Sequence, residues 1–145
     1  ILPVSFVAGS REIIDTLTPG SEGSTFGGYP LASVVGVYAI KALVDLKLAN
    51  NAKIRGEQLM NHFNDIKDDF PDKIKEIRGR GLLTAFEMHN EPHLDGHRVS
   101  VELLNQGVYA KETHRSTVRF APALTIEAWQ IDNMAEKLRN VIREL

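Results

Sequence analysis

A predicted helix without a polar face constrains this chain more than any other feature. Pro30 suits the first position of a helix, where its missing N–H would have no helical partner. The first turns after it are apolar on nearly every side, through Leu31, Val34, Val35, Val37, Tyr38 and Ile40. A helix that is apolar all round is stable only when other structure covers each face. The rest of the chain offers little cover, so we expect it to come from structure outside this chain or from self-association.

Composition excludes several classes of protein. The 145 residues, 43% of them hydrophobic, are enough to form a small globular core. Seventeen basic and nineteen acidic side chains give a net charge of −2, so we expect neither nucleic acid nor a membrane as a partner. We find no apolar run of about 18 residues and no signal-peptide pattern. The absence of cysteine excludes a disulfide framework and a thiolate metal site.

The first half of the chain combines a short β-rich run, a glycine-rich loop and long helices. Residues 3–9 read as a strand, and Ser10 as the cap of a short helix. A loop of glycines and small hydroxyl residues covers positions 18–29. The helix from Pro30 is expected to reach about residue 49 and to break at positions 50–51. A second helix then follows to Pro71.

The second half predicts a β-α-β-β-α unit, which gives the chain an α/β fold class with a small α+β domain. Residues 77–81 (IRGRG) suggest a basic turn before a strand over 82–88. Asp95 and Gly107 are the expected start and end of a helix. Short strands are expected over 108–111 and 117–121, and a last helix capped by Thr125.

Two segments offer binding chemistry on their local pattern. The loop at residues 23–28 (GSTFGG) combines hydroxyl donors with a following helix N-terminus, which together favour a phosphate. Arg119 alternates with Val118 and Phe120 on a predicted strand and can present its planar fork to a carboxylate. From the local pattern alone, a ligand-free glycine-rich connection and a solvated or ion-paired strand arginine are the simpler interpretations.

Other polar groups point less clearly to chemistry. Residues 111–114 (KETH) could supply an acid and a base, but a polar hairpin loop explains them more simply. His89, His93 and His97 are spaced by four, but Pro92 interrupts any helix that would align them, so we expect no metal site. No lysine has the apolar setting that a Schiff-base nucleophile needs, so no catalytic residue is assigned.

Three segments together resemble the class III aminotransferases, which use pyridoxal phosphate. Residues 23–32 (GSTFGGYPLA) resemble the family signature G-S-T-[FY]-G-G-N-P-L-[AG]. Residues 78–83 (RGRGLL) resemble R-G-x-G-L-[LF], and residues 118–124 (VRFAPAL) resemble [VI]-R-[FI]-A-P-x-L. Residues 111–114 resemble the K-x-T-H of the ornithine-specific members. The likeness follows the family order and covers the whole chain.

The resemblance implies the C-terminal part of a fold-type I transferase. Residues 1–50 would close the large cofactor domain, residues 51–71 would form a connecting helix, and residues 72–145 would form the small domain. The family lysine that bonds the cofactor precedes the segment that matches residue 2, so the chain alone is expected to be inactive and not to bind pyridoxal phosphate. The parent enzyme would transfer the δ-amino group of ornithine to 2-oxoglutarate.

The resemblance also assigns residues. Thr25 matches the threonine that hydrogen-bonds the cofactor phosphate across a dimer interface, and Ser24 matches its neighbour at the edge of that site. Arg119 matches an arginine that meets a carboxylate of the substrate or of a protein glutamate. Tyr29 stands where the family usually has asparagine, and Ala123 where the ornithine enzymes often have proline.

Three further expectations follow from the resemblance. The partners would be an amino acid, a 2-oxo acid and further copies of the same chain, in a homodimer or a higher homo-oligomer. The location would be cytoplasmic, or the mitochondrial matrix in a eukaryote. Specificity for acetylornithine or another ω-amino donor remains open, as does a non-catalytic α/β interaction module.

Overall fold

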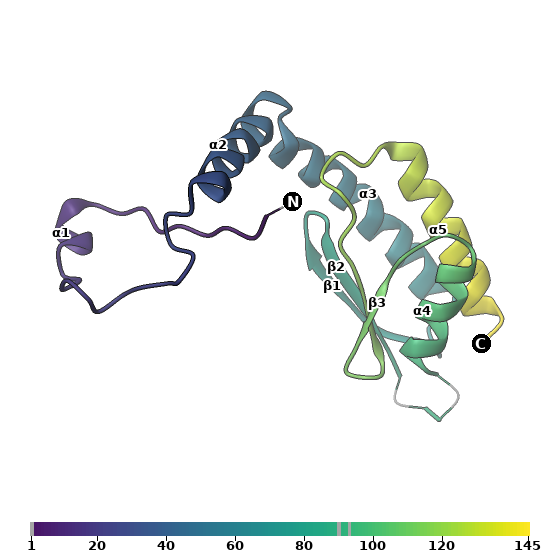
Figure 1. The fold of residues 1–145 in the computed structure, drawn as a ribbon. Coiled ribbons are helices and arrows are strands. Elements are labelled where there is room, and N and C mark those ends of the chain that lie inside the picture. Colours follow the sequence, from purple (N-terminus) through teal and green to yellow (C-terminus); the bar gives the residue numbers. More distant parts are fainter. Residues whose placement is uncertain (1, 90, 93) are drawn as a thin grey trace. The chain divides into compact units, whose positions relative to one another are not determined.

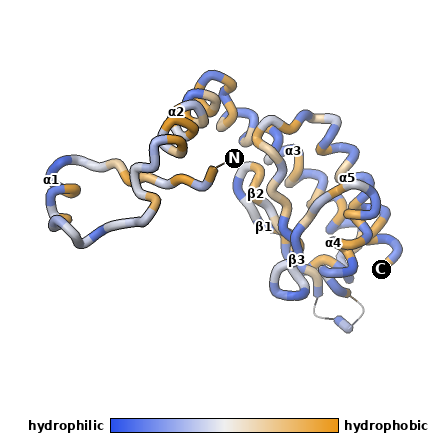
Figure 2. Tube along the Cα trace, in the orientation of Figure 1, coloured by the Kyte–Doolittle hydropathy of each residue, from blue (hydrophilic) through white to orange (hydrophobic). Residues whose placement is uncertain are grey.

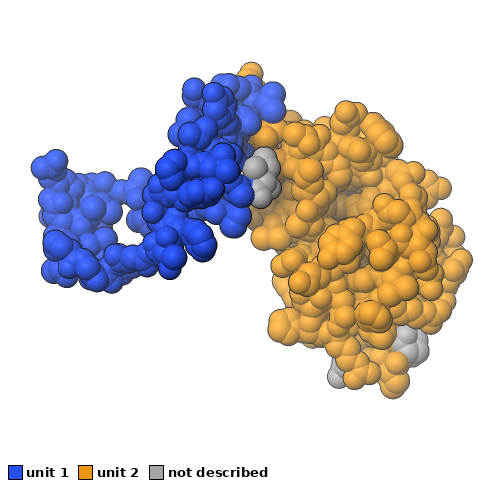
Figure 3. Space-filling model, viewed as in Figure 1, with its two compact units in different colours: residues 1–46 blue, residues 47–145 orange. Residues whose placement is uncertain are grey.

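The chain divides at Lys47, whose backbone takes a left-handed conformation with φ 50°. The computed structural model describes residues 2–89, 91–92 and 94–145. It forms two units, Ile1–Leu46 and Lys47–Leu145, drawn in two colours in Figure 3. A lysine in this region of φ/ψ space costs free energy that an unbroken helix would avoid. Because a left-handed residue cannot continue a right-handed helix, the long helical region is interrupted at Lys47, a few residues before the predicted break.

The described residues of unit 1 form two helices, α1 (Arg11–Ile14) and α2 (Pro30–Asp45). Ser10 stands at the N-cap of α1 as predicted, although its side chain makes no capping hydrogen bond. The strand predicted over residues 3–9 is wrong, since the described part of that segment has no regular structure. A strand needs a neighbour to pair its backbone groups, and β1, the first strand of the sheet, begins only at Ile74.

Helix α2 is apolar and uncovered within its own unit. None of its residues is buried, and Figure 2 shows the hydrophobic colouring along it. Val4 of the preceding segment lies over Gly36, which provides a small part of the missing cover. The sequence correctly predicted a helix without a polar face, and unit 1 alone does not bury it.

Within its described residues, unit 2 is built from a four-stranded antiparallel sheet and three helices (Figure 1). Its elements in chain order are α3 (Leu48–Asp69), β1 (Ile74–Arg80), β2 (Leu83–Met88), α4 (Gly96–Asn105), β3 (Lys111–Thr113), β4 (Thr117–Phe120) and α5 (Ala128–Arg143). The strand order is β1-β2-β4-β3. Helix α3 packs on β1 and β2, α4 packs on β3 and β4, and α5 packs against both helices.

The core lies between the helices and one face of the sheet. Phe63 of α3 meets Phe120 of β4 edge-on at 5.2 Å and Phe86 of β2 at 6.0 Å between ring centroids. Aliphatic side chains from every helix of the unit complete it, among them Leu59, Ile66, Val99, Leu103, Ile131, Leu138 and Ile142. The buried side chains of β2 and β4 face this core, and the opposite face carries Ala85 and Glu87 of β2 and Arg119 of β4.

Strand β1 is the main correction to the predicted second half. Residues 77–80 were predicted to belong to a turn, but they pair with β2 in a hairpin that turns at Gly81, with φ 57°. A β-bulge between Ile74 and Glu76 lets Ile74 and Ile77 face the same core at a spacing of three. The strand is not recognisable from the hydrophobic pattern of the sequence, because in a regular strand the buried positions repeat every two residues. The unit is therefore β-β-α-β-β-α after helix α3.

Several smaller predictions are confirmed or shifted. Asp95 caps α4 by accepting a hydrogen bond from the His97 N–H, and Gly107 has the left-handed φ of 79° expected after a helix. Helix α5 begins two residues later than predicted, with Glu127 at the cap and its N–H donating to the Gln130 side chain. Strand β3 begins only at residue 111. Within the described residues, no helix combines the length and apolar character that crossing a bilayer requires.

Candidate functional site

The glycine-rich loop of unit 1 exposes both of its predicted cofactor residues. Ser24 and Thr25 are solvent-exposed. The Ser24 carbonyl accepts a hydrogen bond from the Gly27 N–H at 3.0 Å, which closes a tight turn. Gly28 follows with φ 71°, a conformation that residues with a side chain rarely adopt. This turn brings the loop directly to the start of α2, as the sequence predicted.

A hollow of about 390 Å³ lies beside this loop. Ser24, Ser5 and Ser33 contribute hydroxyl groups to its lining, and Phe26 and Tyr29 contribute aromatic rings. The Ser33 hydroxyl donates to the Tyr29 carbonyl at 3.0 Å and is therefore already engaged. The side chains of Ser5 and Ser24 and the first N–H groups of α2 remain as donors that can meet an anion here.

The charge of the loop shows what part of a cofactor it can hold. Between residues 18 and 33 the only charged side chain is that of Glu22. The loop therefore offers hydroxyls, backbone N–H groups and the positive end of the α2 dipole, but no cation. A phosphate dianion fits these donors as one edge of its site and takes its countercharge from elsewhere. The residues thus suit a phosphate contact of pyridoxal phosphate and not the whole binding site.

The open face of the unit 2 sheet places Arg119 in a row of cations. In the register of the sheet, Arg78 of β1 lies opposite Ala85 of β2, and Ala85 lies opposite Arg119 of β4. Arg119 in turn lies opposite Lys111 of β3. The three cationic side chains are exposed, whereas Val118 and Phe120 on either side of Arg119 are buried. The predicted alternation around Arg119 is confirmed.

Glu87 neutralises one end of this row. It accepts hydrogen bonds from Lys75 at 2.7 Å and from Arg78 at 2.9 Å, and Glu76 lies 3.3 Å from Arg78. The hydrogen bonds from Lys75 and Arg78 hold the pKa of Glu87 below its ordinary value. In the parts of the chain that the structure describes, no carboxylate oxygen lies within 4.0 Å of Arg119 or Lys111. The cationic charge available to a ligand is thus concentrated on β3 and β4.

The KETH segment does not form an acid–base cluster. Residues 111–113 form strand β3, so alternate side chains point to opposite faces. Glu112 faces helix α4, where its carboxylate lies 3.6 Å from His97. Lys111 points to the open face, and His114 follows in the turn with φ 55°. The loop interpretation was also incomplete, because most of the segment is strand; His93, the central histidine of the other candidate set, lies outside the described residues.

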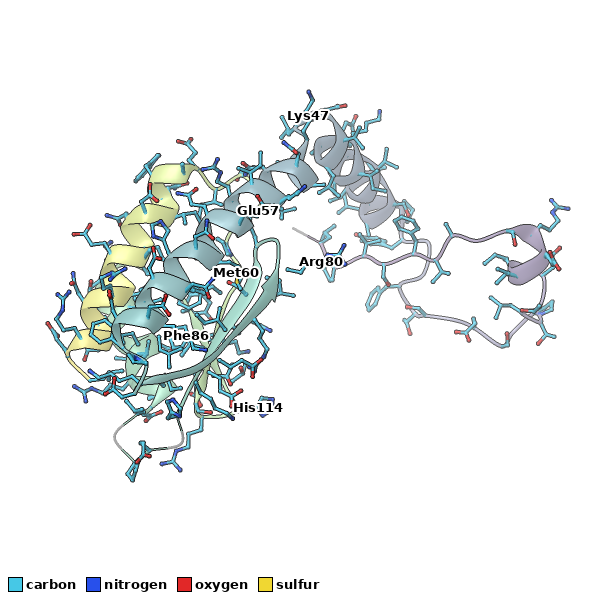
Figure 4. All side chains as sticks on the ribbon, turned by 180° about the vertical axis from the view of Figure 1, so that it is seen from behind. Lys47, Glu57, Met60, Arg80, Phe86 and His114 are labelled. Carbon is cyan, nitrogen blue, oxygen red and sulfur yellow. The ribbon has the colours of Figure 1, made fainter. Side chains whose placement is uncertain are left out.

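A second hollow, of about 700 Å³, lies between helix α3 and the tip of the β1–β2 hairpin. Its charged lining residues are Lys53, Glu57 and Arg80, and Met60 adds an apolar side (Figure 4). Arg80 is at the hairpin end of the sheet and His114 at the opposite end, so the two do not share a site. The RGRGLL segment therefore contributes Arg78 to the open sheet face and Arg80 to this hollow.

The sequence interpretation missed the row that surrounds Arg119. Arg78 was assigned to a turn, and Lys111 was considered only together with its sequence neighbours. A cross-strand row depends on which strands pair and in what register, and neither is encoded in a single strand. Ser24 and Thr25 belong to unit 1, and Arg119 belongs to unit 2. Their roles toward cofactor and substrate stay predictions.

Known proteins are similar to this chain along nearly its whole length. The family described as "Aminotransferase class-III" matches residues 2–142. An ornithine aminotransferase of Staphylococcus carnosus is 40% identical over 141 residues, covering 97% of this chain and 34% of its own. The mitochondrial ornithine aminotransferase of Arabidopsis thaliana is 38% identical over 144 residues, covering 98% of this chain and 30% of its own. The chain therefore spans about a third of the length of these relatives.

Solved structures with the same fold include enzymes named for two different substrates, ornithine and acetylornithine. The ornithine aminotransferase of Toxoplasma gondii aligns with a TM-score of 0.82 at 35% identity, over 92% of this chain and 31% of that one. An acetylornithine aminotransferase from Elizabethkingia anophelis aligns with a TM-score of 0.81 at 32% identity, over 92% and 33%. The predicted fold, part of a fold-type I pyridoxal-phosphate transferase, is confirmed. This chain belongs to the class III aminotransferase family.

Proposed function

We propose that this chain is part of an enzyme that transfers the δ-amino group of ornithine to 2-oxoglutarate, giving glutamate semialdehyde and glutamate. The observation that carries the proposal is the extent of the match: relatives named ornithine aminotransferase are 38–40% identical over 97–98% of the chain. That range includes both the hydroxyl loop of unit 1 and the strand that carries Arg119. The KETH segment, which resembles the ornithine-specific members, supports the same substrate.

In this proposal the loop of unit 1 holds the cofactor by its phosphate. Ser24 and Thr25 donate their hydroxyl hydrogens to phosphate oxygens, and the N-terminal end of α2 adds a favourable dipole. Because the loop lacks a cation, it serves as one wall of a site completed by other residues, in agreement with a contact made across a dimer interface. Pyridoxal phosphate, when bound, supplies the electron sink for amino transfer.

Arg119 recognises a carboxylate of the amino acid or the 2-oxo acid. Its guanidinium is planar and can donate two parallel hydrogen bonds to a carboxylate. The small Ala85 beside it leaves room above the sheet, and Glu87 is occupied by Lys75 and Arg78 rather than by Arg119. The role of this chain is thus to position and bind, and the covalent chemistry needs a lysine that the resemblance places outside residues 1–145.

Turnover with two amino donors tests the substrate. The complete enzyme that contains this chain, loaded with pyridoxal phosphate, is expected to produce glutamate semialdehyde from ornithine and 2-oxoglutarate at a kcat/KM at least tenfold above that for acetylornithine. The reverse preference would support the alternative that the structural match to an acetylornithine aminotransferase favours. Absence of amino transfer with every donor would instead favour a non-catalytic module.

Inactivity of the 145-residue chain is a separate expectation. The isolated chain mixed with pyridoxal phosphate should show neither amino transfer nor a stable change in the cofactor's visible absorbance. A stable, saturable absorbance change would show that a lysine within residues 1–145 bonds the cofactor and would contradict this part of the proposal.

A further inference from the structure

Two cations lie directly opposite each other on the edge of the unit 2 sheet. Lys111 of β3 is the register partner of Arg119 of β4. Side chains of directly opposed residues on antiparallel strands lie roughly 4.5–5.5 Å apart at Cβ. Like charges at such positions destabilise a sheet. The pair is therefore unfavourable for the sheet by itself, and an anion that bridges both cations would relieve it.

The packing of α4 establishes that both side chains face the open side. A Cβ on Gly96 of α4 would contact Val118 at 3.2 Å and Glu112 at 3.4 Å, so these two residues face the helix. Lys111 and Arg119 are their immediate neighbours along β3 and β4 and therefore point to the opposite face. Both side chains are exposed there.

The neighbouring charges select where an anion would bind. At the β1 side of the row, Arg78 is already engaged by Glu87 and Glu76. At the β3 side, Glu112 lies on the other face of its strand, toward His97. A carboxylate approaching the sheet thus meets its strongest attraction above β3 and β4. The acidic groups near β1 disfavour a long polyanion that would extend across the whole sheet.

We propose that Lys111 and Arg119 together form a carboxylate-binding site, in which the lysine ammonium contributes a second charge to the arginine fork. The ligand class is a small dicarboxylate, such as the 2-oxo acid of an amino transfer. The proposal rests on the function proposed above for Arg119 and adds Lys111 as a residue that strengthens dicarboxylate binding. It requires neither the cofactor nor turnover, so binding to the chain alone can test it.

The test is a titration of the ¹⁵N-labelled 145-residue chain with glutarate, followed by amide chemical shifts at constant ionic strength. Glutarate is expected to shift amides of β3 and β4 in a saturable manner. Lys111→Met should weaken the apparent affinity roughly threefold to tenfold, whereas Lys111→Arg should retain it. Lys53→Met removes an exposed lysine of helix α3 and serves as the matched control, with unchanged affinity expected.

The outcomes separate this proposal from the proposed function. Equal glutarate affinity for the wild-type chain and Lys111→Met would overturn the role of Lys111 while leaving that of Arg119 intact. Saturable shifts that disappear in Arg119→Met but are unaffected by Lys111→Met would likewise assign the binding to the arginine alone. Absence of saturable shifts in β3 and β4 would overturn the two-cation site itself, and the turnover assay would then decide the function independently.

Discussion

Phe63 is a buried aromatic residue of the unit 2 core. Its ring contacts those of Phe86 and Phe120 and is 1% exposed. It thereby connects helix α3 to the two central strands of the sheet. Aromatic pairs of this geometry add to the free energy of hydrophobic burial.

Removing this ring should destabilise the sheet. Phe63→Ala is expected to lower the free energy of unfolding by about 3–5 kcal/mol, through lost burial and the cavity left behind. Urea unfolding followed by circular dichroism measures the effect. Phe26→Ala provides a control, because that side chain is 80% exposed and its loss should change stability little. A similar small change in both variants would contradict the assigned core.

Arg119 is the residue on which substrate binding depends in the proposed function. Arg119→Ala in the complete enzyme should raise the KM for 2-oxoglutarate roughly tenfold to a hundredfold, since a bidentate charged contact is lost. Arg98→Ala removes an exposed arginine from helix α4 and is the matched control. Unchanged KM in Arg119→Ala would show that the substrate carboxylate is bound elsewhere.

At the level of elements, a close backbone approach holds helix α3 against the β1–β2 hairpin. A Cβ added to Gly56 would overlap the carbonyl of Gly81, and that carbonyl belongs to the backbone of a tight turn. Neither group can move without shifting a helix or a hairpin. A glycine within a helix normally costs stability, so here its small size is needed for packing.

Glycine-to-alanine changes in the consecutive helices α3 and α2 should therefore have different effects on stability. Gly56→Ala is expected to lower the unfolding free energy of unit 2 by about 2 kcal/mol or more through overpacking. Gly36→Ala in α2 meets only Val4 at 3.6 Å and should be neutral or slightly favourable for the helix. Thermal unfolding of both variants measures the difference. Equal effects would contradict the close approach at Gly56.

Helices α3 and α5 are joined by a hydrogen-bonded polar contact with a predictable pH dependence. Asp132 accepts hydrogen bonds from His62 at 2.8 Å and Gln58 at 2.6 Å, and these hold its pKa below the ordinary value. Because the folded pKa is lowered, the contribution of Asp132 to stability is present above the unfolded pKa of about 3.9. It is lost as the pH falls through the lower folded value.

A carboxyl ¹³C titration by NMR tests this contact. The pKa of Asp132 should lie below about 3.9 in the wild-type chain and move upward in His62→Ala, with a smaller upward movement in Gln58→Ala. Asp65, an exposed carboxylate elsewhere on α3, serves as the internal reference. An unchanged Asp132 titration in His62→Ala would show that the contact does not persist in solution.

Some features of the helices and strands could be predicted from the sequence, and others could not. The start of α4 at the capping carboxylate of Asp95 and its end before Gly107, which tolerates a positive φ, were predicted correctly. So was the alternation around Arg119, because two buried neighbours fix its face. Strand β1 was missed because its bulge breaks the two-residue repeat. The break at Lys47 was placed too late because Asn51, which reads as a helix breaker, instead donates to the carbonyls of Leu124 and Ile126.

At the level of the whole molecule, the two units differ in how well they bury their apolar side chains. Unit 2 has a continuous core, whereas no residue of α2 in unit 1 is buried. Exposed apolar side chains of unit 1 include Phe6, Val7, Phe26, Val34, Val37 and Tyr38. An apolar surface of this extent is unusual in a monomer, and we predict that a second copy or structure outside this chain covers it.

Sedimentation velocity over a range of concentrations tests that expectation. The chain is expected to self-associate, and Val34→Asp combined with Tyr38→Asp should shift the distribution toward monomer. The same pair of changes on polar positions of unit 2, Asn64→Asp and Gln106→Asp, controls for added charge. A strictly monomeric wild-type chain with α2 ordered would contradict it.

The strand order β1-β2-β4-β3 has a consequence for how the candidate carboxylate site comes into existence. Strands β1 and β2 are joined by a tight turn, so they can pair early, whereas pairing β4 with β2 requires closing the longer segment that contains α4 and β3. Non-local pairing is the slow part of forming such a sheet. We therefore predict that Arg119 reaches its place beside Ala85 after the β1–β2 hairpin has formed. Pulse-labelled hydrogen exchange should show β4 amides protected after those of the β1–β2 hairpin, and a chain that has formed only this hairpin would lack the proposed carboxylate-binding face.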